Sequence, residues 1–259
     1  MSQPLVKQAS PDHEAQFFGQ TYRRGTRDRV LKFYRAVRSS KRHFDSLLLA
    51  HAPGRMVLDY GAGIGQYSLF LARHGAKVVG IDISPTAIEL ATQRARKEGL
   101  DNVTFRAMDA EHLEFEDHSF DIVCGAGILH HLHLPAALAE VLRVLKPGGK
   151  AIFREPMGHN PAINLFRRIT PNLRSKGERP LRMDDLRAIK GYFERADFAF
   201  FHLFSILMLP LADRAMAARL AQALDRFDSL LLKRVPDLAP LAWHVVMLLE
   251  GPRKSASAR

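Results

Sequence analysis

Short apolar runs alternate with amphipathic segments from about residue 55 to residue 155. The runs MVLDY, KVVGIDIS, VTFRAMDA, FDIVCGAG and KAIFREP predict buried strands at 56–60, 77–84, 103–110, 120–127 and 150–156. The segments between them include GQYSLFLARHG, SPTAIELATQRARKEGL and LPAALAEVLRVLKPGG, which predict helices. Strands that alternate with helices are typical of a doubly wound, mostly parallel α/β sheet with right-handed crossovers.

Helix signals support this pattern at the second of these helices. Ser84 stands where an N-cap is expected, Pro85 takes the first helical position, and Gly99 follows the last apolar turn. We therefore expect a helix over about 85–98.

The flanking segments predict the remaining elements. Residues 1–50 are expected to form an N-terminal helical lid, with Phe17, Phe18, Tyr22, Phe33 and Tyr34 as its aromatic side chains. FAFFHLFSIL and LAWHVVMLLE predict two more strands, joined by an apolar helical insertion at 213–235. The main domain is expected over 51–250, with 156–195 and 206–240 contributing to a substrate pocket. The tail 251–259 is expected to be disordered.

Three glycines lie within five positions directly after the first predicted strand. Gly61, Gly63 and Gly65 end that strand and precede a helix. Ligands of such sheets bind at the carboxyl ends of the strands, and a helix N-terminus there offers free N–H groups. Without Cβ atoms at residues 61 and 63, a ligand can rest against the backbone. The loop therefore predicts a site for a nucleoside-bearing cofactor.

Two acidic residues follow the next strands. Asp82 ends the second strand about 20 residues after the glycines, where a carboxylate can bind both ribose hydroxyls. Asp109 follows the third strand, where it can accept from an adenine amine. The dinucleotide fingerprint G-x-G-x-x-G is not met, because Gln66 occupies the place of its third glycine.

These motifs resemble the class I S-adenosylmethionine-dependent methyltransferases, in the subgroup that acts on small molecules of the quinone and natural-product type. VLDYGAGIG resembles the first motif, VVGIDIS the second, AMDAEHLEFEDHSFDIV the third and fourth, and LRVLKPGGKAIF the segment that follows. The resemblance implies a seven-stranded, Rossmann-like sheet with an antiparallel last strand and S-adenosyl-L-methionine as cofactor. It also implies methyl transfer to a small acceptor by in-line displacement, with the methylated atom (O, N, S or C) unresolved.

The resemblance also implies which residues contact the cofactor. Gly61, Ala62 and Gly63 would border its methionine part, with Asp59 orienting the loop or meeting the ammonium through water. The ribose is expected at Asp82. The adenine is expected against Ile83, Asp109 and Ala110. The full expected set is Asp59, Gly61, Ala62, Gly63, Asp82, Ile83, Asp109, Ala110, Gly125 and Tyr22.

Candidate bases follow the fourth and fifth strands. GAGILHHLH contains His130, His131 and His133, and a histidine can act as a base near neutral pH. Because adjacent residues do not share a helical face, at most one of His130 and His131 is expected to face the pocket, and His130 is favoured. Glu155, at the rim where the fifth strand ends, and His159 are the other candidates.

No metal is predicted. Some relatives bind a divalent ion near the fourth strand with two carboxylates and a histidine, but Gly127 and His130 stand where those acids would be. No cysteine and histidine spacing indicates zinc.

Charge and composition limit the kinds of binding partner and the cellular compartment that we expect for this protein. The net charge of +11 is distributed as +7 for residues 1–55, −3 for 56–153, +5 for 154–195 and +2 for the rest. Basic flanks can attract an anionic part of the acceptor through Arg167 or Arg168, a lipid surface or a nucleic acid, or merely confer solubility. One cysteine and no apparent signal peptide or spanning segment predict a cytoplasmic protein, with peripheral membrane contact open and the oligomeric state unknown.

Three other functions stay open at this point. A nucleic-acid methyltransferase is supported only by the basic flanks, and no Asn-Pro-Pro-aromatic signature is present. A nicotinamide-dependent oxidoreductase is disfavoured by the glycine spacing and the lack of a Tyr-x-x-x-Lys pair. A catalytically silent cofactor-binding protein is the third. A small, apolar or aromatic acceptor is favoured because of the apolar insertion.

Overall fold

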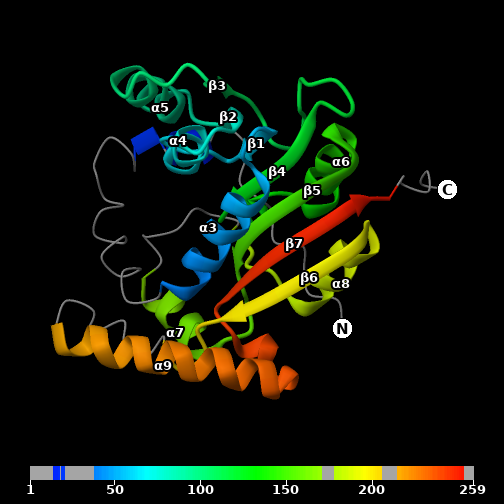
Figure 1. Cartoon of the computed structure of the whole chain (residues 1–259). Coiled ribbons are helices and arrows are strands. Elements are labelled where there is room, and N and C mark those ends of the chain that lie inside the picture. The colour runs from blue at the N-terminus through cyan, green and yellow to red at the C-terminus, as the bar shows by residue number, and fades with distance from the viewer. Residues whose placement is uncertain (1–13, 18, 21–37, 171–177, 206–214, 254–259) are drawn as a thin grey trace.

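The computed structural model describes residues 14–17, 19–20, 38–170, 178–205 and 215–253 (Figure 1). Within the expected lid, Phe18, Tyr22, Phe33 and Tyr34 lie outside the described residues, as does 254–259 of the expected tail. The helix expected before residue 51 is described as α3 (Ser39–His51).

A seven-stranded sheet in the order β3-β2-β1-β4-β5-β7-β6 forms the centre of the molecule. β1 pairs in parallel with β2 and β4, β2 with β3, and β4 with β5, whereas β7 is antiparallel to β5 and to β6. The predicted fold class is confirmed. The strands are β1 (Met56–Tyr60), β2 (Lys77–Asp82), β3 (Val103–Ala107), β4 (Phe120–Ala126), β5 (Leu145–Pro156), β6 (Phe193–Phe201) and β7 (His244–Pro252).

Helices cover both faces of the sheet and its carboxyl edge (Figure 1). Besides α3, the α-helices are α4 (Gln66–Arg73), α5 (Pro85–Lys97), α6 (Leu134–Val144), α7 (Pro161–Ile169), α8 (Met183–Gly191) and α9 (Ala215–Arg234). Two 3-10 helices are η1 (Leu129–His131) and η4 (Pro236–Leu241).

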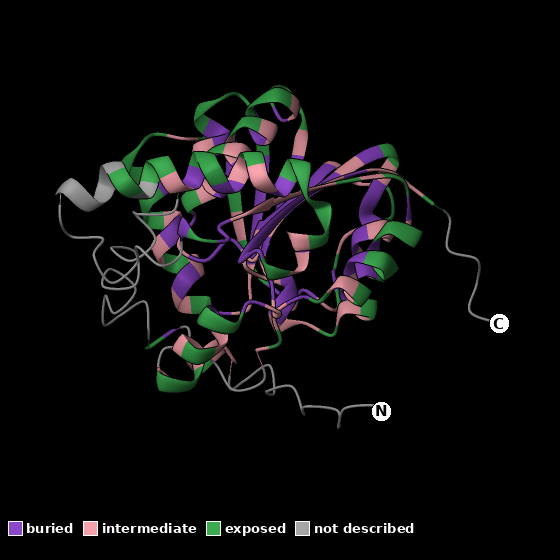
Figure 2. Cartoon of the chain, turned by 90° about the horizontal axis from the view of Figure 1, so that it is seen from below, coloured by how far each residue is buried: buried purple, intermediate pink, exposed green. Residues whose placement is uncertain are grey.

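Successive residues of each central strand serve different layers. In β1, Val57 packs with α3 and α4, whereas Leu58 packs with α6 and α8. In β5, Ile152 lies in the same apolar cluster as Val57, and Phe153 lies in the same apolar cluster as Leu58. Strand side chains alternate between faces, so an apolar run without polar breaks buries both faces of the sheet. Figure 2 shows these strands as the most buried part of the chain.

The sequence signals set most local boundaries. The side chain of Ser84 accepts from Ala87 N at 3.3 Å and Pro85 begins α5, as predicted. The third predicted helix is shorter than expected, because α6 ends at Val144 and Leu145 already pairs with Phe120 of β4. Pro147 lacks the N–H that a continued helix would need.

The last strands differ from their expected bounds. β6 runs over 193–201 rather than 198–207, and it stops at His202, which adopts a left-handed conformation with φ +66°. The expected disordered tail begins too early, because Gly251 and Pro252 belong to β7 and Arg253 N donates to Tyr192 O. Antiparallel pairing of Pro252 with Phe193 of β6 holds these residues in place.

The inner face of α3 is part of the sheet's core. Phe44 and Leu48 are fully buried, and the Phe44 ring meets Tyr67 edge to face at 5.1 Å. The α3 part of the predicted lid thus packs directly on the sheet.

This packing predicts unequal costs for truncating two apolar residues of α3. Phe44→Ala should lower the free energy of unfolding by about 3 to 5 kcal/mol, because it leaves a cavity in a close-packed core. Leu49→Ala is the control, because Leu49 is 40% exposed, and it should change stability by about 0.5 kcal/mol or less. Denaturant unfolding monitored by circular dichroism measures both values. Equal losses would contradict the placement of α3.

Candidate active site

The predicted binding loops meet at one edge of the sheet. β1, β2, β4 and β5 are parallel, so the segments that follow Tyr60, Asp82, Ala126 and Pro156 share the carboxyl edge. The strand order reverses between β1 and β4, where ligands of open α/β sheets bind. The glycine loop and the histidine turn follow these two strands.

The glycine loop depends on left-handed backbone conformations. Gly61, Gly63 and Gly65 have φ angles of +78°, +54° and +80°. Side chains other than glycine rarely adopt such angles without strain. Ala62 N donates to Ile81 O at 2.7 Å, which fixes the loop against the end of β2. The spacing of the glycines is therefore explained by the backbone path as well as by ligand approach.

Two glycines of the expected cofactor set also allow close packing within the protein. A Cβ at Gly61 would lie 2.8 Å from the side chain of Ile128, and a Cβ at Gly125 would lie 2.8 Å from Ile128 and from Tyr60 O. The sequence interpretation attributed the missing Cβ at residue 61 to a ligand alone. The structure adds a second cause, which is the contact between the glycine loop and the turn that carries His130.

Asp82 ties the glycine loop to the end of β2. One carboxylate oxygen accepts from Gly63 N at 2.8 Å and the other accepts from Ser84 N at 2.9 Å. A carboxylate is an acceptor only, so this side chain is chemically suited to ligand hydroxyls. Asp82 is partly exposed at this edge, and Ile83 beside it is half-buried. The arrangement suits a ribose with an attached aromatic base.

Asp109 and Ala110 continue this rim. The carboxylate of Asp109 accepts from Glu111 N at 2.8 Å and contacts His112 Nδ1 at 3.3 Å, so it caps its own turn. Ala110 is 8% exposed and its carbonyl accepts from the Tyr60 hydroxyl. Ala110 thus has a structural role, whereas the partly exposed Asp109 keeps lone pairs for a ligand.

Asp59 is buried beneath the loop. It is 2% exposed and accepts from Ser68 Oγ at 2.5 Å, which anchors the first turn of α4. Burial raises the pKa of Asp59 to about 6, and the hydrogen bond from Ser68 opposes that rise. Two roles are expected for Asp59, either to orient the glycine loop or to meet the cofactor's ammonium through water. The contact with Ser68 is of the first kind, because it holds the helix that follows the loop.

Glu155 and His130 form a buried pair. His130 Nδ1 lies 2.7 Å from one oxygen of Glu155, and the other oxygen accepts from Ile128 N at 2.9 Å and Leu129 N at 3.0 Å. Glu155 is 0% exposed, so it does not stand at the pocket rim where the sequence analysis placed it. Its carboxylate instead caps the start of η1 and fixes the ring of His130.

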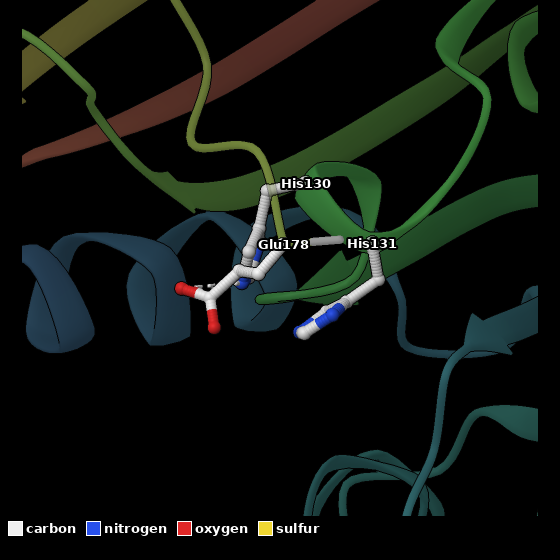
Figure 3. A group of neighbouring side chains, drawn as sticks. All are labelled: His130, His131 and Glu178. Atoms are coloured by element: carbon white, nitrogen blue, oxygen red, sulfur yellow. Dashed lines mark ion pairs between the residues drawn. The ribbon is translucent and has the colours of Figure 1, made fainter. Parts of the chain in front are cut away.

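The two adjacent histidines lie side by side. The ring centroids of His130 and His131 are 4.1 Å apart, and Figure 3 shows both rings pointing the same way beside Glu178. The two residues belong to the short 3-10 turn η1 rather than to an α-helix. The expectation that at most one of them faces the pocket stays a prediction.

Glu178 is a site residue that the sequence analysis missed. Its carboxylate lies 3.9 Å from His130 Nε2, and Arg179 N donates to His130 O at 2.8 Å. Glu178 is 48 positions away in the chain and belongs to no motif. The backbone hydrogen bonds of Leu181 with Pro156 and Gly158, together with that of Arg179, hold this segment beside η1.

His130, His131 and Glu178 are also the group of described residues that could hold a metal ion. Their ligand atoms lie within 4.8 Å of one another. Two imidazoles and a carboxylate suit a divalent transition metal, and the contact of His130 Nδ1 with Glu155 resembles the outer-shell contact of many metal-bound histidines. The expected absence of a metal therefore stays a prediction, and the site offers a direct test of it.

The other predicted site residues lie farther along the same edge. His159 is half-buried, and its Nδ1 has no hydrogen-bond partner among the described residues. Arg167 donates to Met157 O at 3.2 Å and to Asn164 at 3.1 Å, whereas Arg168 is exposed.

The chain matches a known protein family over its first five strands. Residues 57–149 match the family model described as "Methyltransferase domain". This part of the chain is thus similar to a methyltransferase domain. The match begins at the second residue of β1 and ends within β5, so it includes the glycine loop, Asp82, Asp109 and His130 of this domain.

Curated relatives share the methyltransferase domain. The chain is 42% identical over 102 residues to methyltransferase GfsG of Streptomyces halstedii, which is 38% of this chain and 36% of the relative. It is 38% identical over 109 residues to demethylmenaquinone methyltransferase of Tropheryma whipplei, covering 42% and 44%. It is 36% identical over 141 residues to phthiotriol/phenolphthiotriol dimycocerosates methyltransferase of Mycobacterium tuberculosis, covering 52% and 51%. The chain thus spans about a third to a half of these relatives.

Solved structures share the fold beyond the methyltransferase domain. The YcgJ protein from Bacillus subtilis superposes with a TM-score of 0.56 at 20% identity, over 83% of this chain and all of that chain. Phosphoethanolamine N-methyltransferase 2 of Haemonchus contortus, in complex with S-adenosyl-L-methionine, superposes with a TM-score of 0.57 at 21% identity, over 81% and 53%.

The helices give no sign of a bilayer span. Among the residues that the structure describes, none of the helices combines the length and apolar character needed to cross a membrane.

The buried Asp59 predicts a pH-dependent stability. A pKa of about 6, raised from 3.8 in the unfolded chain, means that the native state loses stability as pH rises from about 4 to about 6. The loss amounts to about 3 kcal/mol above pH 6. The advantage of Asp59→Asn over the natural protein should therefore grow by about that amount between pH 4 and pH 7, measured by urea unfolding.

Asp101→Asn is the matched control for this experiment, because it removes an exposed carboxylate. Its difference from the natural protein gives the baseline at each pH. A stability difference for Asp59→Asn that does not change with pH would contradict the buried, pKa-shifted carboxyl.

Proposed function

We propose that the protein transfers a methyl group from S-adenosyl-L-methionine to a small acceptor with an apolar or aromatic body. The observation that carries this proposal is the contact between the glycine loop and the turn that carries His130. Ile128 packs against Gly61 and Gly125, and Glu155 holds both the turn and the His130 ring. A cofactor site and a candidate base thus adjoin at one edge of a methyltransferase domain.

The residues present fit the cofactor. The carboxylate of Asp82 is partly exposed beside the glycine loop, where it can meet ribose hydroxyls while it holds Gly63 N, and the N-terminus of α4 faces the same loop. Ile83 and Asp109 offer an apolar surface and an acceptor for an adenine. When bound, S-adenosyl-L-methionine supplies a methyl group on a positively charged sulfur, ready for in-line displacement.

His130 is the proposed general base. Its Nδ1 faces the Glu155 carboxylate, which fixes the tautomer with the proton on Nδ1 and leaves the Nε2 lone pair toward Glu178. Nε2 can then take the proton from an acceptor hydroxyl or amine. Glu155 acts as a positioning residue, because it is buried and both of its oxygens are occupied.

The nature of the acceptor follows from the relatives and the surroundings of the site. Two relatives are named for demethylmenaquinone and for phthiotriol dimycocerosates. We extend to this chain an acceptor of this kind, a small molecule with an apolar part. The site then acts in the cytoplasm, where the buried thiol of Cys124 stays reduced.

Other reactions remain as outcomes of the tests. The cyclase SpnF superposes on this chain with a TM-score of 0.55, so the fold alone does not fix the reaction. If the basic segments bind a nucleic acid, the affinity of the protein for RNA or DNA should fall steeply as the salt concentration rises. Tight, salt-sensitive binding of RNA or DNA, with methyl incorporation into the polymer, would replace the small-molecule proposal.

Cofactor binding should depend on Asp82. Asp82→Ala should weaken binding of S-adenosyl-L-methionine by roughly 1 to 3 kcal/mol in calorimetry, because ribose hydroxyls lose a charged partner and Gly63 N loses its acceptor. Asp82→Asn keeps an acceptor for Gly63 N, so its affinity for S-adenosyl-L-methionine should lie between those of the natural protein and Asp82→Ala. Asp101→Ala, at an exposed position, is the control. Unchanged affinity in Asp82→Ala, or preference for NAD over S-adenosyl-L-methionine, would refute the assignment.

Catalysis should depend on His130 more than on its neighbours. In a methyl-transfer screen of hydroxyl, amine and thiol acceptors, His130→Gln should lower kcat by about a hundred- to ten-thousand-fold. Glu155→Gln should also lower kcat while cofactor affinity is retained. His133→Gln is the matched control, because His133 is exposed and lies outside the His130, His131 and Glu178 group. Equal activity of His130→Gln and the natural protein would exclude the proposed base.

A chelator separates a base from a metal ligand at the same group. With His130 as base, activity should survive dialysis against a strong chelator, and His131→Gln should have a small effect. Loss of activity that a divalent metal restores, together with equal losses in His130→Gln and His131→Gln, would assign the group to a metal.

A further inference from the structure

Large apolar side chains are exposed on one part of the surface. Among the described residues, eight of the nine exposed large apolar side chains lie on α7, on α9, on η4, at Val235 between α9 and η4, or in the turn after β6; the ninth is Leu49 on α3. We call these eight the apolar rim: Leu165, Ile169, Phe204, Leu220, Phe227, Leu230, Val235 and Leu241. Such a concentration marks an interaction surface, whereas scattered exposed residues would not.

The apolar rim is continuous across its elements. The Phe204 and Phe227 rings lie 6.3 Å apart, and Asn160 Nδ2, at the start of α7, donates to Leu241 O of η4 at 2.6 Å. α9 also packs against η4 and β6. Figure 1 shows α7 and η4 beside α9, and Figure 2 shows exposed residues along α9 on the face toward the viewer.

The acids of α9 are turned away from this surface. Asp225 accepts from Ser39 Oγ at 2.5 Å and contacts His202 at 3.1 Å, and Asp228 accepts from the backbone N–H groups of residues 203–205. Asp225 and Asp228 are 4% and 1% exposed. Leu220, Phe227 and Leu230 recur at helical spacing on the opposite side.

The exposed charges of the same helices are basic. Arg168 on α7 and Arg226, Lys233 and Arg234 on α9 are exposed, and Asp237 of η4 is the exposed acid among the described residues of these elements. An apolar stripe with basic flanks and inward-turned acids is the pattern of a helix that lies in the interface of an anionic membrane.

We infer that the apolar rim docks the protein on the surface of an anionic phospholipid bilayer. α7 follows the carboxyl end of β5, α9 follows that of β6, and η4 precedes β7, so the rim lies at the same edge of the sheet as the candidate active site. The docked protein would face the bilayer with its active-site edge. If the proposed function holds, the acceptor is a lipid taken from the membrane.

Vesicle co-sedimentation tests the docking surface. The full-length protein should bind vesicles of phosphatidylcholine with phosphatidylglycerol about tenfold or more tightly than vesicles of phosphatidylcholine alone, and added salt should weaken that binding. Phe227→Ser/Leu230→Ser should lower the vesicle affinity roughly tenfold or more. Leu49→Ser, which changes the exposed apolar residue outside the rim, should bind like the natural protein.

Two double variants that each remove two positive charges test the role of the basic residues in vesicle binding. Arg226→Gln/Arg234→Gln should weaken binding to the anionic vesicles by about tenfold or more. Arg96→Gln/Lys97→Gln removes the same charge from the exposed side of α5 and should have a much smaller effect. Equal losses in the two pairs would show only a net-charge effect and would overturn the proposed surface.

Two further measurements keep this inference separate from the proposed function. Calorimetry with S-adenosylhomocysteine should give the same affinity for the rim variants as for the natural protein, which shows that they are folded. Absence of that binding in the natural protein would defeat the proposed function and leave the vesicle result standing. No binding to anionic vesicles would overturn the docking inference, and so would a dimer that Phe227→Ser/Leu230→Ser converts to monomers.

Discussion

The candidate site depends on one buried carboxylate. Glu155, at the end of β5, accepts from two backbone N–H groups after β4 and holds the ring of His130. A buried charge is stable only when its lone pairs are occupied, and here the backbone and one imidazole occupy them. The same contacts shape η1, and Ile128 of that turn fills the space left by Gly61 and Gly125. The proposed base, the glycine loop and the ends of β4 and β5 are thereby held together.

The carboxylates beside the glycine loop divide their work according to burial. Asp59 is buried and holds α4 through Ser68, whereas Asp82 is partly exposed and holds Gly63 at the edge of the sheet. Burial raises the pKa of Asp59 to about 6. The carboxylate that holds α4 beside the glycine loop therefore lowers the stability of the native state at neutral pH.

Buried carboxylates also hold elements together farther along the carboxyl edge, at α9. Asp225 and Asp228 bind groups of α3 and of the turn after β6, and this turns the acidic side of α9 inward. The exposed charges among the described residues of α9 are basic, and its exposed large side chains include Leu220, Phe227 and Leu230. Internal hydrogen bonds of one helix thus determine the chemistry of the surface next to the site.

The sequence by itself determined the strand and helix order, the glycine loop and the acids at successive strand ends. These features are local, because apolar periodicity, caps such as Ser84 and left-handed glycines act within a few residues. The burial of Glu155, the side-by-side histidines, the approach of Glu178 and the exposed rim were decided only by the tertiary structure. Each of these depends on contacts between segments far apart in the chain, such as residue 178 with residue 130 and α9 with α3, which no local pattern records.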